Sequence, residues 1–359
     1  MRVHPYEQRV KRLLASLEDE HLDGLLLQSA DHRRYFLATG VAGVALVTRA
    51  QNYLITHFVD LAEARQQAQG CQVVRWGGED RRSLTSVAAG LVQESRLRRV
   101  GYEARVMSHA DFQALSEAFT GVWLVPADDL LADLRAVKTS EEIIAFERAG
   151  AIDDAAFEHV LSVIRPGVTE LEVAAELERF IRSHGVERFS FGTIVVSGPR
   201  AAFCHGTPSS RAIKAGDLVT MDYGAVWDGC ASDLTRTVAV GYATEKAREV
   251  YEAVQKAQEL ALAAARPGIT GEELDRVARQ HIEAAGYGSC FGHGLGHSLN
   301  YGPRAAPGAK VELRPGHVLT VEPGIYLEGW GGVRIEDDIV LTADGCRLLT
   351  HAPRELIVI

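Results

Sequence analysis

The sequence has few cysteines, no long apolar run and no basic cluster. Its cysteines are odd in number and scattered, and they include no Cys-x-x-Cys pair: Cys71, Cys204, Cys230, Cys290 and Cys346. This usage favours reduced thiols in a cytoplasmic protein over a disulfide scaffold. The first ten residues lack the apolar core of a signal peptide, and no stretch of about 18 apolar residues predicts a membrane span. Since the net charge is −10, nucleic acid is not expected as a partner.

The composition that is present suits a globular chain of two domains. The 359 residues are 47% hydrophobic and 24% charged, enough for two full cores. In residues 1–130 helical and strand patterns alternate, which predicts an α/β domain, and no catalytic motif is recognisable there. Residues 131–359 form the second predicted domain, which opens with a long helix capped by Thr139 and Glu142. In the first domain the predicted helices lie near 6–20, 58–68, 82–93 and 108–118, and the predicted strands near 24–27, 44–48, 52–56, 72–76, 98–102 and 122–126.

The second domain contains an internal repeat. The segment Arg-Pro-Gly-Val-Thr at 165–169 recurs as Arg-Pro-Gly-Ile-Thr at 266–270, and each copy opens an amphipathic helix. The two helices end near Gly185 and Gly286, and a Phe-Gly pair follows each of them. We therefore predict two similar αβ halves with a cleft between them.

Two aspartates lie on either side of a predicted hairpin turn. Asp228-Gly229 is a strong hairpin signal, and a turn centred at Trp227-Asp228 would place Asp222 and Asp233 directly opposite each other. Opposed Cβ atoms lie roughly 5 Å apart, and two carboxylates that close repel unless a proton or cation lies between them. This segment by itself is compatible with a metal site and with an exposed strand carrying scattered acids.

A second hairpin and a histidine run favour the metal site. Glu322 and Glu336 are symmetric about the turn at 328–331, and His297 ends a Gly-rich run. Four carboxylates with one imidazole suit two divalent ions such as Mn, Co or Zn better than one structural zinc. Cys204 beside His205 could suggest a thiol nucleophile, but the metal set accounts for that neighbourhood better.

These motifs closely resemble the M24 metallopeptidases, the pita-bread family of prolidase, aminopeptidase P and methionine aminopeptidase. The resemblance covers residues from about 130 to 359, and the preceding domain is similar to the creatinase/prolidase N-terminal domain. It implies an α/β and α+β chain whose pita-bread domain has an internal pseudo-two-fold repeat, two divalent metal ions and a homodimer. The metal ligands that it implies are Asp222, Asp233, His297, Glu322 and Glu336.

The resemblance also implies catalytic roles. Two cations lower the pKa of a bridging water, and Glu322 would carry a proton to the leaving nitrogen. His205 would stabilise the tetrahedral intermediate, and Arg304 would hold the terminal carboxylate of a dipeptide. Arg334 would orient the ligands. The alternatives are a turn histidine for His205 and a surface arginine for Arg304.

Three further residues match positions near the family's proline pocket. Phe191 and Ile194 match residues that line it, although without the resemblance they would be assigned to the core of a strand. His293 matches a histidine near the same pocket, and a purely structural role is its alternative.

The chain departs from the family after His297. Most members continue with a Val-His-Glu segment before x-Pro-Arg, whereas this chain lacks about four residues there and has Asn300 and Tyr301 where His-Glu is usual. Either residue could donate a hydrogen bond, but neither can carry the same charge as histidine. In the first domain, Arg33 and Arg34 are predicted to lie in a loop, from which one arginine could close a neighbouring cleft to long peptides.

The function that these patterns favour is hydrolysis of the Xaa-Pro bond of dipeptides, as in a prolidase. Aminopeptidase P, which acts on longer peptides, is the main alternative because it shares every metal motif. The altered Asn300-Tyr301 segment keeps another small C–N substrate open. A non-enzymatic binding module has little reason to keep five facing ligands, and a bound metal would distinguish it from an enzyme.

Overall fold

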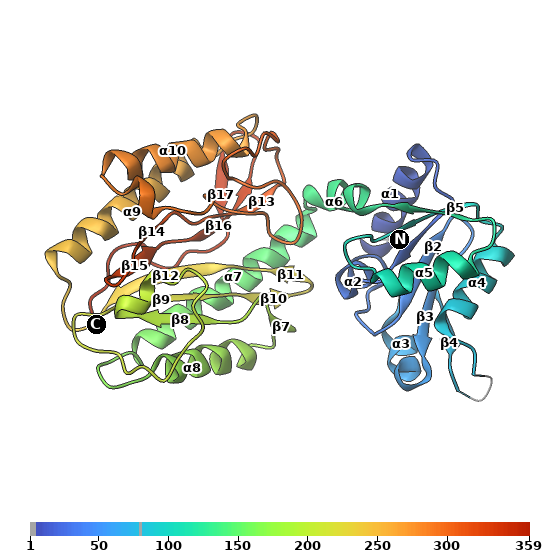
Figure 1. Cartoon of the computed structure of the whole chain (residues 1–359), viewed down its shortest axis with the longest axis horizontal. Helices are drawn as coiled ribbons and strands as arrows, with labels where there is room; N and C mark the ends of the chain where they lie inside the picture. The colour runs from blue at the N-terminus through green and yellow to red at the C-terminus, as the bar shows by residue number, and fades with distance from the viewer. Residues whose placement is uncertain (1–4, 79–80) are drawn as a thin grey trace. The chain divides into compact units, whose positions relative to one another are not determined.

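The computed structural model describes residues 5–78 and 81–359, and the chain divides into two compact units, Met1–Leu134 and Arg135–Ile359 (Figure 1). None of the described helices is long and apolar enough to cross a membrane. All the residues predicted to act in catalysis or metal binding belong to the second unit.

A six-stranded mixed sheet forms the centre of the N-terminal unit. Its strand order is β4-β3-β2-β1-β5-β6, with antiparallel pairing from β1 to β3 and parallel pairing of the other neighbours. Strands β2 and β3 form an antiparallel hairpin, with Ala45 opposite Leu54. The strands are β1 Gly24–Leu27, β2 Val44–Thr48, β3 Tyr53–His57, β4 Gln72–Trp76, β5 Arg99–Tyr102 and β6 Trp123–Pro126.

Helices cover both faces of this sheet. Successive side chains of a strand point to opposite faces, so Leu25 and Leu27 of β1 belong to one apolar core and Leu26 to another. Because both faces are covered, β1 is buried along its whole length, and the predicted α/β domain is confirmed. The first core includes α1 Pro5–Asp19, α2 Ala30–Leu37, α3 Leu61–Gln67 and α6 Asp128–Ala136, and the second includes α4 Leu84–Glu94 and α5 His109–Ala118.

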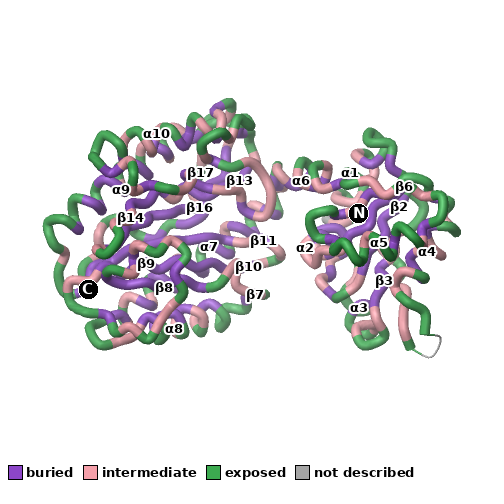
Figure 2. Tube along the Cα trace, in the orientation of Figure 1, coloured by how far each residue is buried: buried purple, intermediate pink, exposed green. Residues whose placement is uncertain are grey.

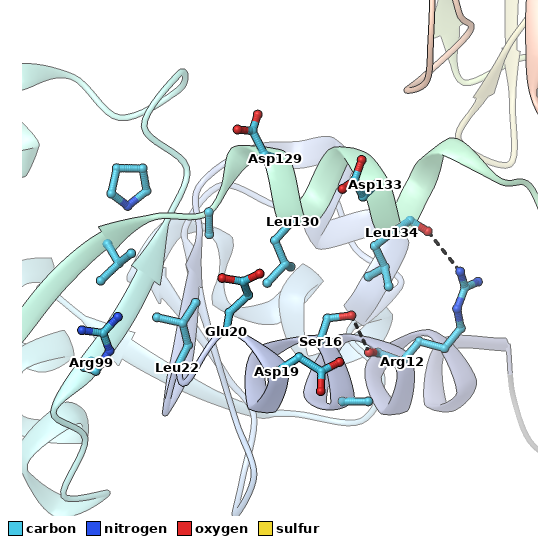
Figure 3. A pocket seen from close by; sticks show the side chains of 14 residues that line it. Arg12, Ser16, Asp19, Glu20, Leu22, Arg99, Asp129, Leu130, Asp133 and Leu134 are labelled. Carbon is cyan, nitrogen blue, oxygen red and sulfur yellow. Dashed lines mark hydrogen bonds between the residues drawn. The ribbon is translucent and has the colours of Figure 1, made fainter. Parts of the chain in front are cut away.

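A hollow of about 790 Å³ lies between α1 and α6 (Figure 3). At one end Arg12 Nη2 donates to the Leu134 carbonyl oxygen over 3.2 Å, and Ser16 Oγ donates to the Arg12 carbonyl oxygen over 3.2 Å. Asp19 and Asp133 also line it, but none of the predicted site residues does.

The prediction that Arg33 and Arg34 lie in a loop is wrong. Both belong to α2, whose first turn is capped by the Ser29 side chain accepting from the His32 amide. The Arg33 guanidinium is buried, and its Nε donates to the Val41 carbonyl oxygen over 2.9 Å. Arg33 therefore supports the fold of its own unit, and nothing in that contact closes a cleft.

The C-terminal unit opens with α7 Ser140–Leu161, and the predicted capping box of Thr139 and Glu142 is confirmed. Two further capping boxes begin the repeated helices, at Thr169 for α8 Glu170–Ser183 and at Thr270 for α10 Gly271–Ala284. The repeated helices therefore start in the same way, as the repeated sequence predicts.

The strands of this unit follow the same repeat. Each half has a three-stranded antiparallel sheet, in the order β12-β9-β8 in the first half and β13-β16-β17 in the second. The Gly216 amide donates to Val240 in the first half, and the Gly316 amide donates to Leu341 in the second. The strands are β7 Arg188–Phe189, β8 Ile194–Ser197, β9 Leu218–Tyr223, β10 Ala225–Trp227, β11 Cys230–Ala231, β12 Leu234–Ala239, β13 Val318–Val321, β14 Gly324–Leu327, β15 Gly331–Arg334, β16 Asp337–Leu341 and β17 Cys346–Leu348.

A separate apolar core stabilises each half. In the first, residues of α7 and α8 pack with β9 and β12. In the second, residues of α10 and of α9 Glu245–Ala264 pack with β13 and β16. In Figure 1 α10 and α8 lie on opposite sides of the strands, and Figure 2 shows these central strands as buried. Strand β12 of the first half lies beside β15 and β16 of the second, and the Glu336 amide donates to the Thr235 carbonyl oxygen over 3.1 Å.

Candidate metal centre and catalytic cavity

The first hairpin differs from its predicted register. Val226 lies opposite Ala231 and Trp227 opposite Cys230, so the turn is Asp228-Gly229. Asp228 and Gly229 both have positive φ, as a tight hairpin turn requires. The predicted turn was one residue too early in the chain, and this misplaced the facing pairs.

As a consequence, Asp222 lies opposite Thr235, and the prediction that Asp222 and Asp233 are direct partners is wrong. Asp233 follows β11, and its amide donates to Asp338 Oδ2 over 2.9 Å. Both aspartates nevertheless line the same cavity, because Asp233 lies two residues before Thr235, the ladder partner of Asp222, and side chains two residues apart in an extended segment point to the same face.

The second hairpin has the predicted register. On one side of the two glutamates Val321 lies opposite Asp337, and on the other side Gly324 lies opposite Arg334. These ladders place Glu322 and Glu336 opposite each other, and both line the cavity.

His297 brings an imidazole into this carboxylate group. Its Nε2 lies 3.5 Å from Asp233 Oδ2 and 3.5 Å from Glu322 Oε1. The other ring nitrogen, Nδ1, donates to the Ser298 carbonyl oxygen over 3.2 Å, which leaves Nε2 as the ring atom that faces the carboxylates. Carboxylates gathered this closely are stable only with a proton or cation among them.

The donor set fits divalent cations. Ligand atoms of Asp233, His297 and Glu336 all lie within 4.8 Å of one another. Asp222 Oδ1 and Glu336 Oε1 are buried and have no hydrogen-bond partner among the described residues. Buried carboxylate oxygens are normally paired, and a cation coordinated by this group would satisfy them.

Burial and mutual repulsion make the carboxylates hard to ionise together without a cation. Burial, followed by the charge of Glu336, raises the pKa of Asp233 well above its usual range. Burial, followed by the charge of Glu322, does the same to the pKa of Glu336. Burial raises the pKa of Glu322 to about 7, although the Arg334 guanidinium acts in the opposite direction.

Arg334 is the buried cation of the site. Its guanidinium donates to Asp222 Oδ2, and its Nε donates to Thr235 Oγ1 over 3.0 Å. The same Thr235 hydroxyl donates to Glu336 Oε2 over 2.6 Å. Arg334 thus connects residues on both hairpins.

The carboxylates lie in a cavity of about 1070 Å³. Its lining includes the other residues that the sequence pointed to for substrate contact: Phe191, Ile194, His205, His293 and Arg304. Ile194 is buried, whereas His205 and Arg304 are exposed at the cavity. The cavity therefore offers an apolar wall and two cationic or hydrogen-bonding side chains around one carboxylate group.

His293 is held as a neutral ring. Its Nδ1 donates to the Gly294 carbonyl oxygen over 2.8 Å, so its Nε2 accepts from the Tyr326 hydroxyl over 2.8 Å. Burial lowers the pKa of His293 to about 4. Arg334 Nη1 in turn donates to the Tyr326 hydroxyl over 2.9 Å. Sequence reasoning did not single out Tyr326, although it lies in the hairpin that carries Glu322.

The His205 segment is held at both ends by a residue that sequence reasoning missed. Glu170 is fully buried at the start of α8 and accepts from the amides of Ser197, at 2.8 Å, and Ser209, at 3.0 Å. His205 lies between these two serines. The available signal was the acidic residue directly after the helix cap Thr169.

Asn300 and Tyr301 lie outside the cavity. Neither is among the residues that line it. The Asn300 side chain instead bonds the β10–β11 turn, and the Arg135 guanidinium stacks 4.3 Å from the centre of the Tyr301 ring.

Comparison with known proteins matches both units to described families. Residues 145–343 match the model of metallopeptidase family M24, and residues 9–137 match the creatinase/prolidase N-terminal domain. An uncharacterized peptidase of Bacillus subtilis, YqhT, is 42% identical over 343 residues, which cover 94% of this chain and 96% of that protein.

Solved structures agree over the whole chain. The Xaa-Pro dipeptidase from Bacillus anthracis superposes with a TM-score of 0.92 at 40% identity and covers 99% of this chain and 100% of its own. An X-Pro aminopeptidase from Thermotoga maritima superposes with a TM-score of 0.91 at 35% identity, covering 98% of this chain and 99% of its own. The expected architecture, a creatinase-type domain followed by a pita-bread domain, is confirmed.

Proposed function

Because the chain belongs to metallopeptidase family M24, we propose that it hydrolyses the Xaa-Pro bond of dipeptides in a metal-dependent reaction. The observation that carries this proposal is the convergence of both hairpins and His297 on one cavity, with the His297 ring 3.5 Å from two carboxylates. The likeness to the Xaa-Pro dipeptidase of Bacillus anthracis supports the choice of a proline-containing dipeptide as substrate.

The residues that would hold the metal are the five side chains identified from the sequence. Two divalent ions would be held by this set, in which Asp233, His297 and Glu336 already lie within reach of one ion: Asp222, Asp233, His297, Glu322 and Glu336. The oxygen-rich set suits manganese or cobalt, and zinc also fits it. When bound, such ions activate water for attack and polarise the scissile carbonyl.

The chain's own side chains would move the proton. Glu322 accepts from the Thr320 hydroxyl at Oε1 over 3.0 Å, which orients the carboxyl group. Burial raises the Glu322 pKa to about 7, so this carboxyl group can take up a proton and pass it to a leaving nitrogen. His205, exposed on its loop, would donate to the oxygen of the tetrahedral intermediate.

The cavity walls would select the substrate. Phe191 and Ile194 provide an apolar surface for the proline ring. Arg304 is exposed at the cavity and would bind the free carboxylate of a dipeptide, a task that suits a guanidinium. His293, whose Nε2 accepts from the Tyr326 hydroxyl, would contact the substrate as an uncharged ring in a fixed orientation.

A second candidate is an aminopeptidase that acts on longer Xaa-Pro peptides. The likeness to the X-Pro aminopeptidase of Thermotoga maritima over nearly the whole chain supports it. The two candidates differ in how Arg304 is used, because only a dipeptide places its terminal carboxylate next to the proline.

The test compares an Xaa-Pro dipeptide with an Xaa-Pro-Xaa tripeptide, with manganese added and after chelation. Chelator-sensitive cleavage of the dipeptide alone supports the proposal, and preference for the tripeptide supports the aminopeptidase. Cleavage of neither substrate overturns both and leaves another small C–N substrate. The variant Asp233→Asn is the control, because it removes one charge at nearly constant volume and should abolish turnover.

We also propose a cytoplasmic homodimer, with dimerisation inferred from the family resemblance. The free thiols of all five cysteines support a reducing location. Light scattering checks the dimer: the particle mass should be twice the 39.0 kDa of one chain.

A further inference from the structure

The segment that departs from the family pattern forms a strap, residues 298–303, between His297 and the cavity residue Arg304. Asn300 lies at its centre with a positive φ of 60°, a conformation that asparagine tolerates better than most residues. Its Nδ2 donates to the Gly229 carbonyl oxygen over 2.6 Å, and its Oδ1 accepts from the Ala231 amide over 3.0 Å. One amide group therefore binds the last residue of the β10–β11 turn and the strand β11 that follows it.

These two hydrogen bonds join the two halves of the C-terminal unit close to the metal centre. Asn300 follows His297 by three residues, and Ala231 precedes Asp233 by two. His297 and Asp233 are the ligands that approach to 3.5 Å, although one comes from each half. If the strap moved away from the β10–β11 turn, the distance between His297 and Asp233 would therefore change as well, because few residues separate them from the hydrogen-bonded residues Asn300 and Ala231.

The other side of the strap is held independently. Lys138, which is 5% exposed, directs its ammonium group to the carbonyl oxygens of Arg135, at 3.0 Å, and Ala136, at 3.1 Å, and to that of Tyr301. The Arg135 guanidinium covers the Tyr301 ring. Within the strap, Ser298 Oγ donates to the Gly302 carbonyl oxygen over 2.9 Å. The middle of the strap is thus held by the β10–β11 turn on one side and by Lys138 and Arg135 on the other. It does not line the cavity, whereas the flanking residues His297 and Arg304 do.

We propose that Asn300 is a positioning residue that clamps the strap to the β10–β11 turn and so sets His297 against Asp233 for metal binding. The inference rests on the proposed function only in assuming that these two side chains bind metal. Asparagine suits the position because a single side chain must donate to one backbone group and accept from the next.

The variants that test the clamp are Asn300→Gly and Asn300→Asp. Glycine keeps the positive φ without strain and removes both hydrogen bonds. Aspartate keeps the acceptor for the Ala231 amide but loses the donor and places a carboxylate oxygen against the Gly229 carbonyl oxygen. We expect either variant to weaken the metal-binding event that involves His297 by about tenfold or more, the scale of a lost ligand-supporting contact.

The matched control is Glu187→Gln. The Glu187 carboxylate accepts from the Gly229 amide over 2.9 Å, so it supports the same turn, but it lies in the same half as that turn. Changing it should leave metal affinity within about twofold of the unmodified chain, because no contact between the halves is lost.

The experiment is a titration of the metal-free full-length protein with cobalt. Calorimetry measures the affinity of each binding event, and visible absorption reports which ligands surround the ion. The expected result for both Asn300 variants is one weakened binding event with an altered spectrum, the other event being unchanged. Excess cobalt should restore turnover, because the clamp acts through metal affinity.

The outcomes separate the clamp from the proposed function. Equal affinities and spectra in Asn300→Gly and the unmodified chain would overturn the clamp alone. Equal weakening of both binding events would also overturn it, since that result indicates general loosening of the unit. If the unmodified chain binds no cobalt, the proposed function fails first. Should Asn300→Gly fold poorly, Asn300→Asp decides by the same criteria.

Discussion

Replacing Glu170 by glutamine should destabilise the C-terminal unit and displace His205. Glu170 Oε1 accepts from the amide and hydroxyl of Ser197, each at 2.8 Å. Oε2 accepts from the amide of Ser209 at 3.0 Å and from its hydroxyl at 2.6 Å. Arg200 Nε also donates to Oε2 over 3.0 Å, so the buried carboxylate binds both ends of the segment that carries His205.

The magnitude follows from the donors that lose an acceptor. Whichever oxygen becomes the glutamine NH₂ group, the amide of Ser197 or Ser209 is left facing another donor, at a cost of roughly 1–3 kcal/mol, and the remaining hydrogen bonds lose their charged acceptor. Allowing for relaxation of the loop, we expect the free energy of unfolding to fall by about 2–4 kcal/mol. In a unit of this size that is a loss of roughly 5–15 °C in Tm.

Urea denaturation and steady-state kinetics test this expectation. The kcat of Glu170→Gln on a dipeptide should fall by up to about 10²-fold, the scale of one lost oxyanion donor, while its metal content stays unchanged. Glu178→Gln is the control, because it makes the same chemical change at a half-exposed position of the same helix. A Glu170→Gln midpoint equal to that of this control, or a destabilised protein with full kcat, would refute the reasoning.

Three further predictions concern the metal ligands, substrate recognition and packing. The metal-free protein should lose stability as pH rises from about 4.5 to about 7, because the raised pKa of Glu322 lets the folded state hold a proton that the unfolded state releases. Its Tm should therefore be higher at pH 5.5 than at pH 8, and added manganese should remove that difference. Arg304→Met should raise KM for an Xaa-Pro dipeptide by roughly tenfold or more and leave KM for its C-terminal amide unchanged; equal effects on both substrates would count against the carboxylate contact. Gly271→Ala should lower the free energy of unfolding by about 1–3 kcal/mol, because the added Cβ would lie 1.8 Å from the Arg304 carbonyl oxygen. Gly345→Ala, which meets nothing within 4 Å, is its control in urea denaturation.

The sequence by itself determined the features that depend on near neighbours in the chain. The capping boxes at Thr139, Thr169 and Thr270 are all present, because each is formed by residues three positions apart. The register of Glu322 against Glu336 also followed from the turn between them. Turn chemistry located the first hairpin as well, but a difference of one residue in the turn changed every facing pair.

Only the tertiary structure decided the contacts between distant segments. It placed Arg33 in a buried helix, Glu170 under the His205 loop and Asn300 on the turn before Asp233. It also brought Asp222 and Asp233 to one cavity although they are not ladder partners. The Glu170 and Asn300 contacts join residues 27 and 69 positions apart, and their partners are set by how the C-terminal unit packs. No local pattern specifies that packing, because the same polar side chain is equally compatible with solvent until the fold buries it.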